Sequence, residues 1–237
     1  MILRPFLFEP TACASYLFGC PTTGKLAVVD PHVELVDAYL DAARRIGSPV
    51  VAVFETHLQA DHVSGQKTLA GATGARAYRP EELADGEVVE LGNTVVRVLA
   101  TPGHAPVHNA YVVSDRRRGT EEPWLAFTGD SLLVGDVGRP DLHADGEAQA
   151  LARAQHASMQ RLLALPDHVL VYPSHFGGSV CGRGLSGNPF STIGFERRHN
   201  DALAYEDSEA FARALLTAVP PPPADQARIV ALNREGS

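Results

Sequence analysis

The stretch that decides the fold is Thr56-His57-Leu58-Gln59-Ala60-Asp61-His62, which closely follows the apolar run 50–54. A fully apolar run of this length is typical of a strand buried inside a sheet. The loop after it carries two histidines and an aspartate, which are residue types that bind metal ions. Active sites are commonly built on loops that a rigid scaffold positions. The sequence therefore predicts a metal-binding loop at the end of a central strand.

The same arrangement occurs three more times further along the chain. Each of three further predicted strands ends within a few residues of a histidine or an aspartate: 95–99 precedes His104, 124–127 precedes Asp130, and 169–172 precedes His175. A single histidine after a strand is most often a surface or core residue, but four such residues at equivalent positions favour one shared site. In a layered α/β protein the ends of the strands lie along one edge. We therefore predict that these four side chains meet there.

The rest of the chain alternates short strands with amphipathic helices. The sequence predicts strands at 15–18, 25–30, 91–99 and 109–114, and helices at 33–46, 148–165 and 208–218. Residues 190–200 are predicted to form a polar, aromatic loop. The prolines at 220–223 stop the last helix. A catalytic domain is therefore predicted over residues 1–219, followed by a Pro-rich tail over 220–237.

The composition fits a single domain and excludes some partners. The chain has 237 residues, of which 45% are hydrophobic, and a formal net charge of −8. This length can bury a full core, whereas a nucleic-acid partner would need a dense excess of Lys and Arg. No stretch approaches the roughly 18 apolar residues of a membrane span. Cys13, Cys20 and Cys181 form no C-x-x-C pair, which predicts neither a disulfide framework nor a structural zinc site. We expect a cytoplasmic protein without a nucleic-acid or membrane partner.

Residues 56–62 resemble the T-H-x-H-x-D-H motif of the metallo-β-lactamase superfamily. Thr101-Pro102-Gly103-His104, Gly129-Asp130 and His175 match the later metal motifs of that superfamily in order and spacing. The resemblance extends from about Tyr16 to His175. It implies an α/β (α+β) fold, the four-layer αββα sandwich, in which two β-sheets pack face to face with helices outside.

Gln59 departs from this motif, because it stands where the superfamily normally has its second histidine. In zinc hydrolases of the superfamily that histidine binds the first metal, and a glutamine carbonyl is a poor substitute for imidazole. The departure makes a two-zinc hydrolase less favoured. The remaining residues His57, His104 and Asp130 supply two imidazoles and one carboxylate, which is the ligand set of a mononuclear non-haem Fe(II) oxygenase.

Two further segments resemble the persulfide dioxygenases, a branch of this superfamily. Residues 129–142 resemble their G-D-x-L-F-V-G-D-V-G-R-P-D-L run, and residues 191–200 resemble their S-T-I-G-x-E-R/K segment. No rhodanese domain fits after Asn200, so the resemblance implies the stand-alone form of the rhodanese-fused relatives. It implies one Fe(II) per chain, bound by His57, His104 and Asp130. The implied reaction is oxidation of a low-molecular-weight persulfide, such as glutathione persulfide, by O2 to sulfite and thiol.

The sequence also predicts functions for residues near the metal ligands. Asp61 and His62 are predicted to orient the metal ligands, and His175 either to do the same or to line the pocket. Arg139 and Arg183 are candidates for binding substrate carboxylates, because guanidinium pairs with carboxylate in a two-pronged geometry. A structural salt bridge is the alternative for both arginines. Two nearby residues are predicted to be structural: His108 and Cys181.

Two other functions remain open from the sequence. A zinc-dependent thioester hydrolase of the glyoxalase II type, with Zn(II) as the metal, shares every motif except Gln59. Such enzymes carry a helical domain after the αββα core, whereas about one helix is predicted after Asn200. A non-catalytic αββα protein would keep its metal for structure, but structural sites are usually closed by four protein ligands. The sequence leaves open whether the chain forms a homodimer.

Overall fold

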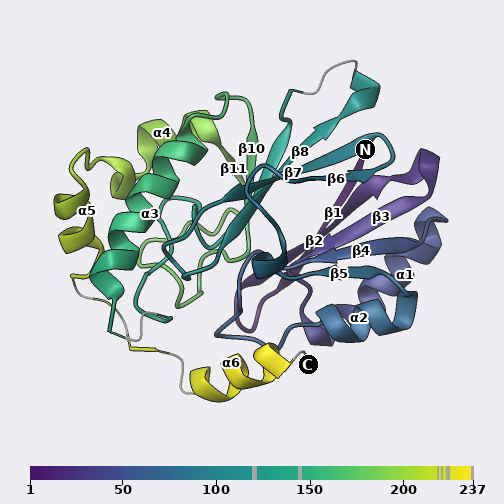
Figure 1. Cartoon of the computed structure of the whole chain (residues 1–237), viewed down its shortest axis with the longest axis horizontal. Helices are drawn as coiled ribbons and strands as arrows, with labels where there is room; N and C mark the ends of the chain where they lie inside the picture. Colours follow the sequence, from purple (N-terminus) through teal and green to yellow (C-terminus); the bar gives the residue numbers. More distant parts are fainter. Residues whose placement is uncertain (119–121, 144–145, 218, 220, 223–224, 236–237) are drawn as a thin grey trace.

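The computed structural model describes residues 1–237 except 119–121, 144–145, 218, 220, 223–224 and 236–237. Two β-sheets pack face to face, and helices cover the outer face of each sheet (Figure 1). Buried aromatic and aliphatic side chains fill the space between the sheets, among them Tyr16, Phe18, Phe54, Tyr111 and Phe127. This arrangement confirms the predicted four-layer αββα sandwich.

The first sheet contains the N-terminal strands in the order β1-β2-β3-β4-β5. Their bounds are β1 Ile2–Phe8, β2 Cys13–Cys20, β3 Lys25–Val29, β4 Val50–Phe54 and β5 Arg76–Tyr78. β4 pairs in parallel with both β3 and β5, whereas β1, β2 and β3 pair antiparallel. One face of β4 lies on the central core and the other lies under helices, which explains its uninterrupted apolar sequence.

The second sheet has the order β11-β10-β9-β8-β7-β6. Its strands are β6 Val88–Leu91, β7 Thr94–Ala100, β8 Asn109–Asp115, β9 Leu125–Gly129, β10 Leu170–Pro173 and β11 Ser191–Thr192. β7 and β9 are both antiparallel to β8, and β10 is parallel to β9. The carboxyl ends of β7, β9 and β10 therefore lie at the same edge, and His104, Asp130 and His175 follow these ends.

Helices cover both sheets. α1 (Val36–Ile46) and α2 (Gln66–Thr73) pack on the first sheet through one apolar cluster. α3 (Ala148–Leu163), α4 (Ile193–His199) and α5 (Ser208–Leu215) pack on the second sheet through another. α6 (Gln226–Glu235) lies apart from these layers, near the C-terminus in Figure 1. Short 3-10 helices occupy connections: η1 Pro21–Thr23, η2 Val33–Leu35, η3 Pro80–Glu82, η4 Arg116–Arg118 and η5 Asp201–Leu203.

Three predicted elements differ from the structure. The predicted strand 91–99 is interrupted at its start: Leu91 ends β6, Gly92 turns the chain with a φ of 66°, and β7 begins at Thr94 and pairs with β6 as a hairpin. The predicted loop 190–200 is wrong, since it contains β11 and α4. The hydroxyl of Thr192 caps α4 by accepting a hydrogen bond from the backbone N–H of Phe195 at 3.1 Å. The predicted tail contains α6, which is anchored by the buried side chain of Ile229, although 220, 223–224 and 236–237 lie outside the described residues.

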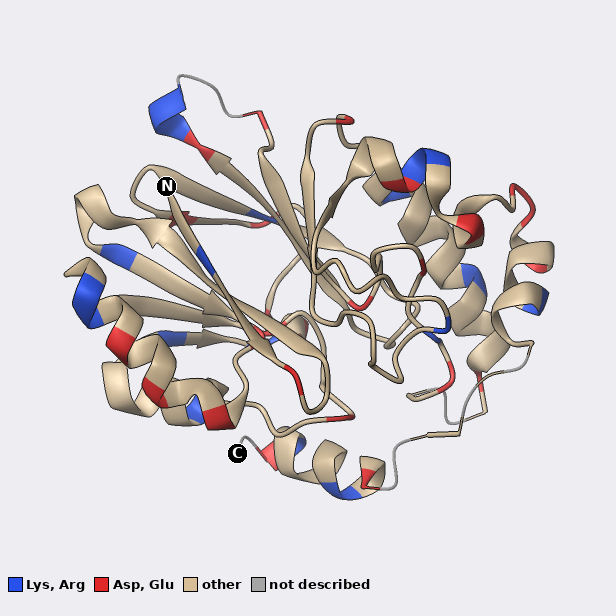
Figure 2. Cartoon of the chain, turned by 180° about the vertical axis from the view of Figure 1, so that it is seen from behind, with Lys and Arg blue, Asp and Glu red and all other residues tan. Residues whose placement is uncertain are grey.

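Charged side chains lie mainly on the helices and connecting loops, while the strands carry few of them (Figure 2). This distribution follows from the two-sided burial of most strands, since charged groups are costly to bury unless they are paired. No described helix combines the length and the apolar character that a membrane span requires. Cys13, Cys20 and Cys181 are all free thiols, as their spacing predicted.

Candidate metal centre

His57, His104 and Asp130 meet at the edge of the sandwich, although they follow three different strands. Nε2 of His57 lies 3.8 Å from Oδ2 of Asp130, and Nε2 of His104 lies 3.5 Å from the same oxygen. The ligand atoms of the three residues all lie within 4.8 Å of one another. All three residues are buried. Atoms at these separations can share one ion, because nitrogen and oxygen ligands lie about 2.0–2.2 Å from a metal such as zinc.

Both histidines are oriented by a hydrogen-bond partner at Nδ1. In His104, Nδ1 lies 2.8 Å from the carbonyl oxygen of Arg139, so this nitrogen carries the proton and donates it. In His57, Nδ1 lies 2.9 Å from Oγ1 of Thr56. Contacts of this kind fix the tautomer and the ring orientation of metal-binding histidines. Nε2 of His104 is therefore free to donate its lone pair to a metal ion.

The carboxylate of Asp130 is positioned by its neighbours and has one free oxygen. Gly129 has a φ of 54°, and a Cβ atom there would lie 2.6 Å from both Nε2 of His108 and Oγ1 of Thr56. The backbone N–H of Asp130 donates to Nε2 of His108 at 3.2 Å, and Oδ1 lies 2.7 Å from Nδ1 of His175. Oδ2 is buried and has no hydrogen-bond partner among the described residues. An unpaired buried carboxylate oxygen is costly, and a cation beside it would remove that cost.

The protonation states of the three residues also suit metal binding. Burial lowers the pKa values of His57 and His104, so both imidazoles are neutral at pH 7. Burial alone would raise the pKa of Asp130, but the neighbouring His175 outweighs this effect and holds the pKa well below its usual range. Metal ligands must be deprotonated. The donor set therefore fits a metal ion that keeps open positions for other ligands.

Asp61, His62 and His175 form a buried network beside this centre. Nε2 of His175 lies 2.6 Å from Oδ2 of Asp61, so the imidazole connects Asp61 with Asp130. Nδ1 of His62 lies 3.1 Å from Oδ1 of Asp61. Burial alone would lower the pKa of His175, but the charges of Asp130 and Asp61 raise it well above its ordinary value. The structure thus brings the three predicted residues together in a network that ends on a candidate ligand.

Cys13 joins this network from the start of β2, a position that the sequence did not mark. Its Sγ lies 3.4 Å from Nε2 of His175 and 3.6 Å from Nδ1 of His62. Burial raises the pKa of the thiol, but the two histidines outweigh it and bring the pKa to about 7. Cys13 and His175 are 162 residues apart. Only the pairing of distant segments brings them together, so no local pattern could identify the contact.

Asp30 is a second residue that the sequence reading missed. It follows β3 and adopts a φ of 48°. Its carboxylate accepts hydrogen bonds from the backbone N–H of Thr56 at 2.7 Å and from the Thr56 hydroxyl at 2.9 Å. The hydroxyl of Ser174 donates to the same carboxylate. Asp30 therefore ties the loop after β4 to the end of β10 in the other sheet. An aspartate directly after a strand is the signal that could have identified it.

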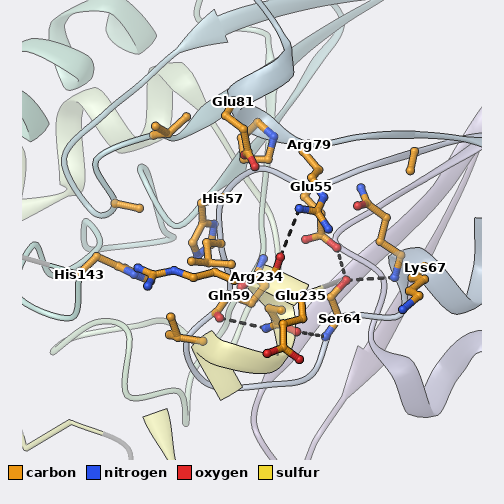
Figure 3. Close-up of a pocket in the computed structure, with 18 of the residues that line it drawn as sticks. Glu55, His57, Gln59, Ser64, Lys67, Arg79, Glu81, His143, Arg234 and Glu235 are labelled. Atoms are coloured by element: carbon orange, nitrogen blue, oxygen red, sulfur yellow. Dashed lines mark hydrogen bonds between the residues drawn. The ribbon is translucent and has the colours of Figure 1, made fainter. Parts of the chain in front are cut away.

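A cavity of about 1130 Å³ opens beside His57 (Figure 3). Gln59 lines the cavity and is 1% exposed. Neither polar atom of its side chain has a hydrogen-bond partner in the part of the chain that the structure describes. The adjacent Glu55 is buried, and burial raises its pKa to about 8. Charged side chains also line the cavity, namely Lys67, Arg79, Glu81, Arg234 and Glu235.

His143 lines the same cavity, although the sequence reading left it out. Its ring centroid lies 5.7 Å from that of His104 and 6.3 Å from that of His57. Nε2 of His143 is buried and has no hydrogen-bond partner within the described residues. The residue lies in a long connection between β9 and α3, without a strand end before it. His143 is therefore placed to contact a molecule bound in the cavity next to the candidate metal ligands.

The two arginines predicted to bind substrate have partners within the protein. The guanidinium of Arg139 is buried and donates to both carboxylate oxygens of Asp141, at 2.9 and 2.7 Å. The guanidinium of Arg183 donates to the carbonyl oxygen of Ala214 at 2.7 Å. Neither arginine lines the cavity beside His57. A substrate role for them stays a prediction, while the contacts of Arg139 are those of the salt-bridge alternative.

The two residues predicted to be structural have buried positions. Nδ1 of His108 lies 2.8 Å from Oγ1 of Thr101, and its ring stacks on that of His57 with centroids 5.0 Å apart. His108 thus supports the backbone of Asp130 and the ring of His57. Cys181 is 2% exposed, and burial raises the pKa of its thiol far above the ordinary value. Its Sγ also lies within 4.8 Å of ligand atoms of Asp130 and His175, so a purely structural role for Cys181 stays a prediction.

An αββα sandwich that gathers histidines and aspartates at its strand ends defines the metallo-β-lactamase superfamily, and this chain belongs to it. The sequence model of the family "Metallo-beta-lactamase superfamily" matches residues 9–86 of this chain. The mitochondrial persulfide dioxygenase ETHE1 of Homo sapiens is 28% identical over 220 residues, which cover 88% of this chain and 78% of the human protein. A hydroxyacylglutathione hydrolase of Synechococcus sp. is 30% identical over 227 residues, covering 81% of this chain and 84% of the relative.

Solved structures of the same superfamily also resemble this chain. The crystal structure of ETHE1 from Myxococcus xanthus superposes with a TM-score of 0.85 and 30% identity, covering 99% of this chain and 98% of that one. A metallo-beta-lactamase from Staphylococcus aureus has a TM-score of 0.91 and 30% identity, covering 98% of this chain and 72% of its own. Because the relatives include both persulfide dioxygenases and hydrolases, the reaction has to be argued from the site itself.

Proposed function

We propose that this chain is a mononuclear non-haem iron persulfide dioxygenase. The observation that carries the proposal is the buried set His57, His104 and Asp130, next to a loop where Gln59 replaces the second motif histidine. Two imidazoles and one carboxylate with open positions are typical of Fe(II) oxygenases. The similarity to the persulfide dioxygenases of Homo sapiens and Myxococcus xanthus supports this choice.

The proposed substrate is a low-molecular-weight persulfide such as glutathione persulfide. One persulfide, one O2 and one water would give one thiol, one sulfite and two protons. Iron, when bound, would activate oxygen and orient the two reactants. Lys67, Arg79 and Arg234 line the cavity with positive charges that suit the carboxylates of such a thiol.

A network of Asp61, His62 and His175 would keep the carboxylate of Asp130 in place. Oδ1 of Asp130 contacts His175, whose other ring nitrogen contacts Asp61, which in turn contacts His62. We propose that this network orients Asp130 and leaves Oδ2 for the metal. These roles for Asp61, His62 and His175 follow the sequence-based prediction. The cytoplasmic location likewise stays a prediction.

A zinc-dependent thioester hydrolase is the second candidate, with a specific observation in its favour. The hydroxyacylglutathione hydrolase of Synechococcus sp. is similar over most of its length. The ligand atoms of Cys13, Asp61, His62 and His175 also lie within 4.8 Å of one another, and this group, which His175 connects to Asp130, could help to hold a second ion. Gln59 argues against this function, because it is a poor ligand for zinc. Hydrolases of this type carry a helical domain after the αββα core, whereas the described part after Asn200 contains only the α-helices α5 and α6.

One experiment separates the two candidates. The protein is purified without added metal, its metal content is measured, and O2 uptake is followed with glutathione persulfide. We expect about one iron per chain and persulfide-dependent O2 uptake that is lost in Asp130→Ala. Two zinc ions per chain, hydrolysis of a glutathione thioester and no O2 uptake would establish the hydrolase instead.

A further inference from the structure

Helix α6, at the far end of the chain, is hydrogen-bonded to the loop that carries the metal motif. We call residues 57–64 the metal loop. The side-chain amide of Asn233 donates to the carbonyl oxygens of Gln59 at 3.0 Å and His62 at 2.9 Å. Its Oδ1 accepts from the backbone N–H of Ser64 at 2.9 Å. These three bonds bracket Asp61 and His62, and they join positions 169 to 174 residues apart in the sequence.

The chemistry of these bonds requires an amide side chain. The metal loop has no helix or strand over residues 58–63, so its backbone groups need partners from elsewhere in the protein. A carboxamide supplies two N–H donors and one carbonyl acceptor at the same time. Asn233 uses all three against two carbonyls and one N–H. Neither an aspartate nor an alanine can make this set of contacts.

α6 is itself held in place and forms a wall of the cavity. Ile229 is buried, the side-chain amide of Gln226 donates to the carbonyl of Leu142, and Arg79 donates to the carbonyl of Arg234 at 3.4 Å. Figure 3 shows α6 beside Gln59 and Ser64, with Arg234 and Glu235 at the cavity. One helix therefore contacts the metal loop through Asn233 and lines the cavity with six residues: Gln226, Ala227, Val230, Asn233, Arg234 and Glu235.

We propose that α6 is an integral part of the active site and that Asn233 is a positioning residue for metal binding. By holding the carbonyls of Gln59 and His62, it fixes the path of the metal loop between His57 and Ser64. Without it the loop relaxes, and His57 and the Asp61 network lose the geometry that a metal ion requires. The proposal rests on the metal site of the proposed function, but it does not depend on which reaction that site performs.

The direct test is Asn233→Ala, with Arg228→Ala as the matched control. Arg228 lies on the same helix, is 67% exposed and pairs only loosely with Asp225 at 3.6 Å. Fe(II) affinity is measured without oxygen by competition with a coloured chelator, in the absence of substrate. We expect Asn233→Ala to weaken Fe(II) binding about tenfold, the lower end of the range for direct partners of metal ligands, because Asn233 holds the backbone of the loop and not a ligand side chain. Backbone hydrogen exchange of the metal-free protein should become faster in residues 57–64.

A second variant separates positioning from simple loss of packing. Asn233→Asp has nearly the same shape and keeps an acceptor for Ser64, but it places a carboxylate against two carbonyl oxygens. We expect Asn233→Asp to weaken Fe(II) binding at least as much as Asn233→Ala. If the alanine variant does not fold, the Fe(II) affinity of Asn233→Asp is the test of the proposal. Wild-type Fe(II) affinity and wild-type exchange in both variants would overturn the proposal. Zn(II) is titrated in parallel. If the protein proves to be a zinc hydrolase, the proposed function is contradicted, but the effect of each variant on Zn(II) affinity still tests the positioning role of Asn233.

Discussion

Nδ1 of His175 lies 2.7 Å from Oδ1 of Asp130, and this contact leaves the other carboxylate oxygen to face the candidate metal centre. Because Oδ1 is engaged, Oδ2 is the oxygen that lies 3.8 Å from His57 and 3.5 Å from His104. The opposite ring nitrogen of His175 contacts Asp61 at 2.6 Å, so the imidazole is held on both sides. We therefore infer that His175 influences metal binding through the orientation of Asp130.

Replacing His175 by alanine should weaken metal binding. The change leaves Oδ1 of the buried Asp130 without its partner and frees the carboxylate to rotate, so we expect a loss of about 10–100-fold in Fe(II) affinity. Anaerobic chelator competition measures it. His168→Ala is the control, because His168 is 53% exposed and lies at the surface. Equal affinities of the His175 variant and the wild type would show that the contact does not orient the ligand.

Replacing Gln59 by histidine should change the metal preference. The variant restores an imidazole to the cavity wall beside His57, and imidazole is a much better zinc ligand than an amide. We expect Zn(II) affinity to rise about tenfold or more, with iron binding largely intact. Titrations with each metal measure both quantities. A complete loss of iron binding would contradict our account of Gln59.

Replacing Arg234 by alanine should raise KM for glutathione persulfide and leave kcat nearly unchanged. Arg234 lines the cavity from α6, where its charge suits a substrate carboxylate. Loss of one solvent-accessible charged hydrogen bond corresponds to a rise in KM of about threefold to tenfold. Steady-state O2 uptake gives both constants. Arg183→Ala, measured alongside, tests the sequence-based prediction, because a larger effect there would place the substrate carboxylates near Arg183.

Replacing Gly129 by alanine should destabilise the protein more than the same change at Gly47. Both glycines have positive φ, 54° and 74°, so both variants incur the left-handed strain of about 1–2 kcal/mol. A Cβ at Gly47 meets nothing within 4 Å, whereas one at Gly129 lies 2.6 Å from His108 and Thr56. We expect an extra cost of about 1–3 kcal/mol at Gly129. Urea unfolding of the metal-free proteins measures the difference, and equal costs would contradict the close packing around Asp130.

His32 should make the metal-free protein less stable in mild acid. Burial lowers the pKa of His32 to about 4, whereas in the unfolded chain it is near 6.5. Below about pH 6.5 the unfolded state therefore binds a proton that the folded state does not, and stability falls as the pH decreases toward 4. At pH 5 the loss amounts to about 2 kcal/mol.

The variant His32→Phe removes this titration and keeps an aromatic ring on Phe8, whose centroid lies 4.0 Å from that of His32. The difference in the free energy of unfolding between wild type and variant should therefore change by about 2 kcal/mol between pH 7 and pH 5. Urea unfolding at each pH measures it. A difference that stays constant with pH would contradict the lowered pKa.

The sequence by itself determined the architecture and the identities of the candidate ligands. Apolar strands such as Val50–Phe54 and the residues that follow them are local patterns, and the order of the metal motifs identified the αββα fold. The positions of His57, His104, Asp130 and His175 after strands predict one shared site, and the resemblance to the persulfide dioxygenases implies that the first three bind the metal. The structure brings these three residues together, because the ends of β7 and β9 lie at one edge of the second sheet and the end of β4 meets them from the first sheet.

Only the tertiary structure decided the surroundings of that site. Asn233 reaches the metal loop from a helix that the sequence suggested to be a tail, and Cys13 reaches His175 from β2. His143 lines the cavity without any strand before it, and Arg139 is engaged by Asp141. These contacts join segments far apart in the chain or depend on side-chain direction in a loop. Local periodicity carries no information about such contacts, because they are set by how the two sheets and the C-terminal helix pack together.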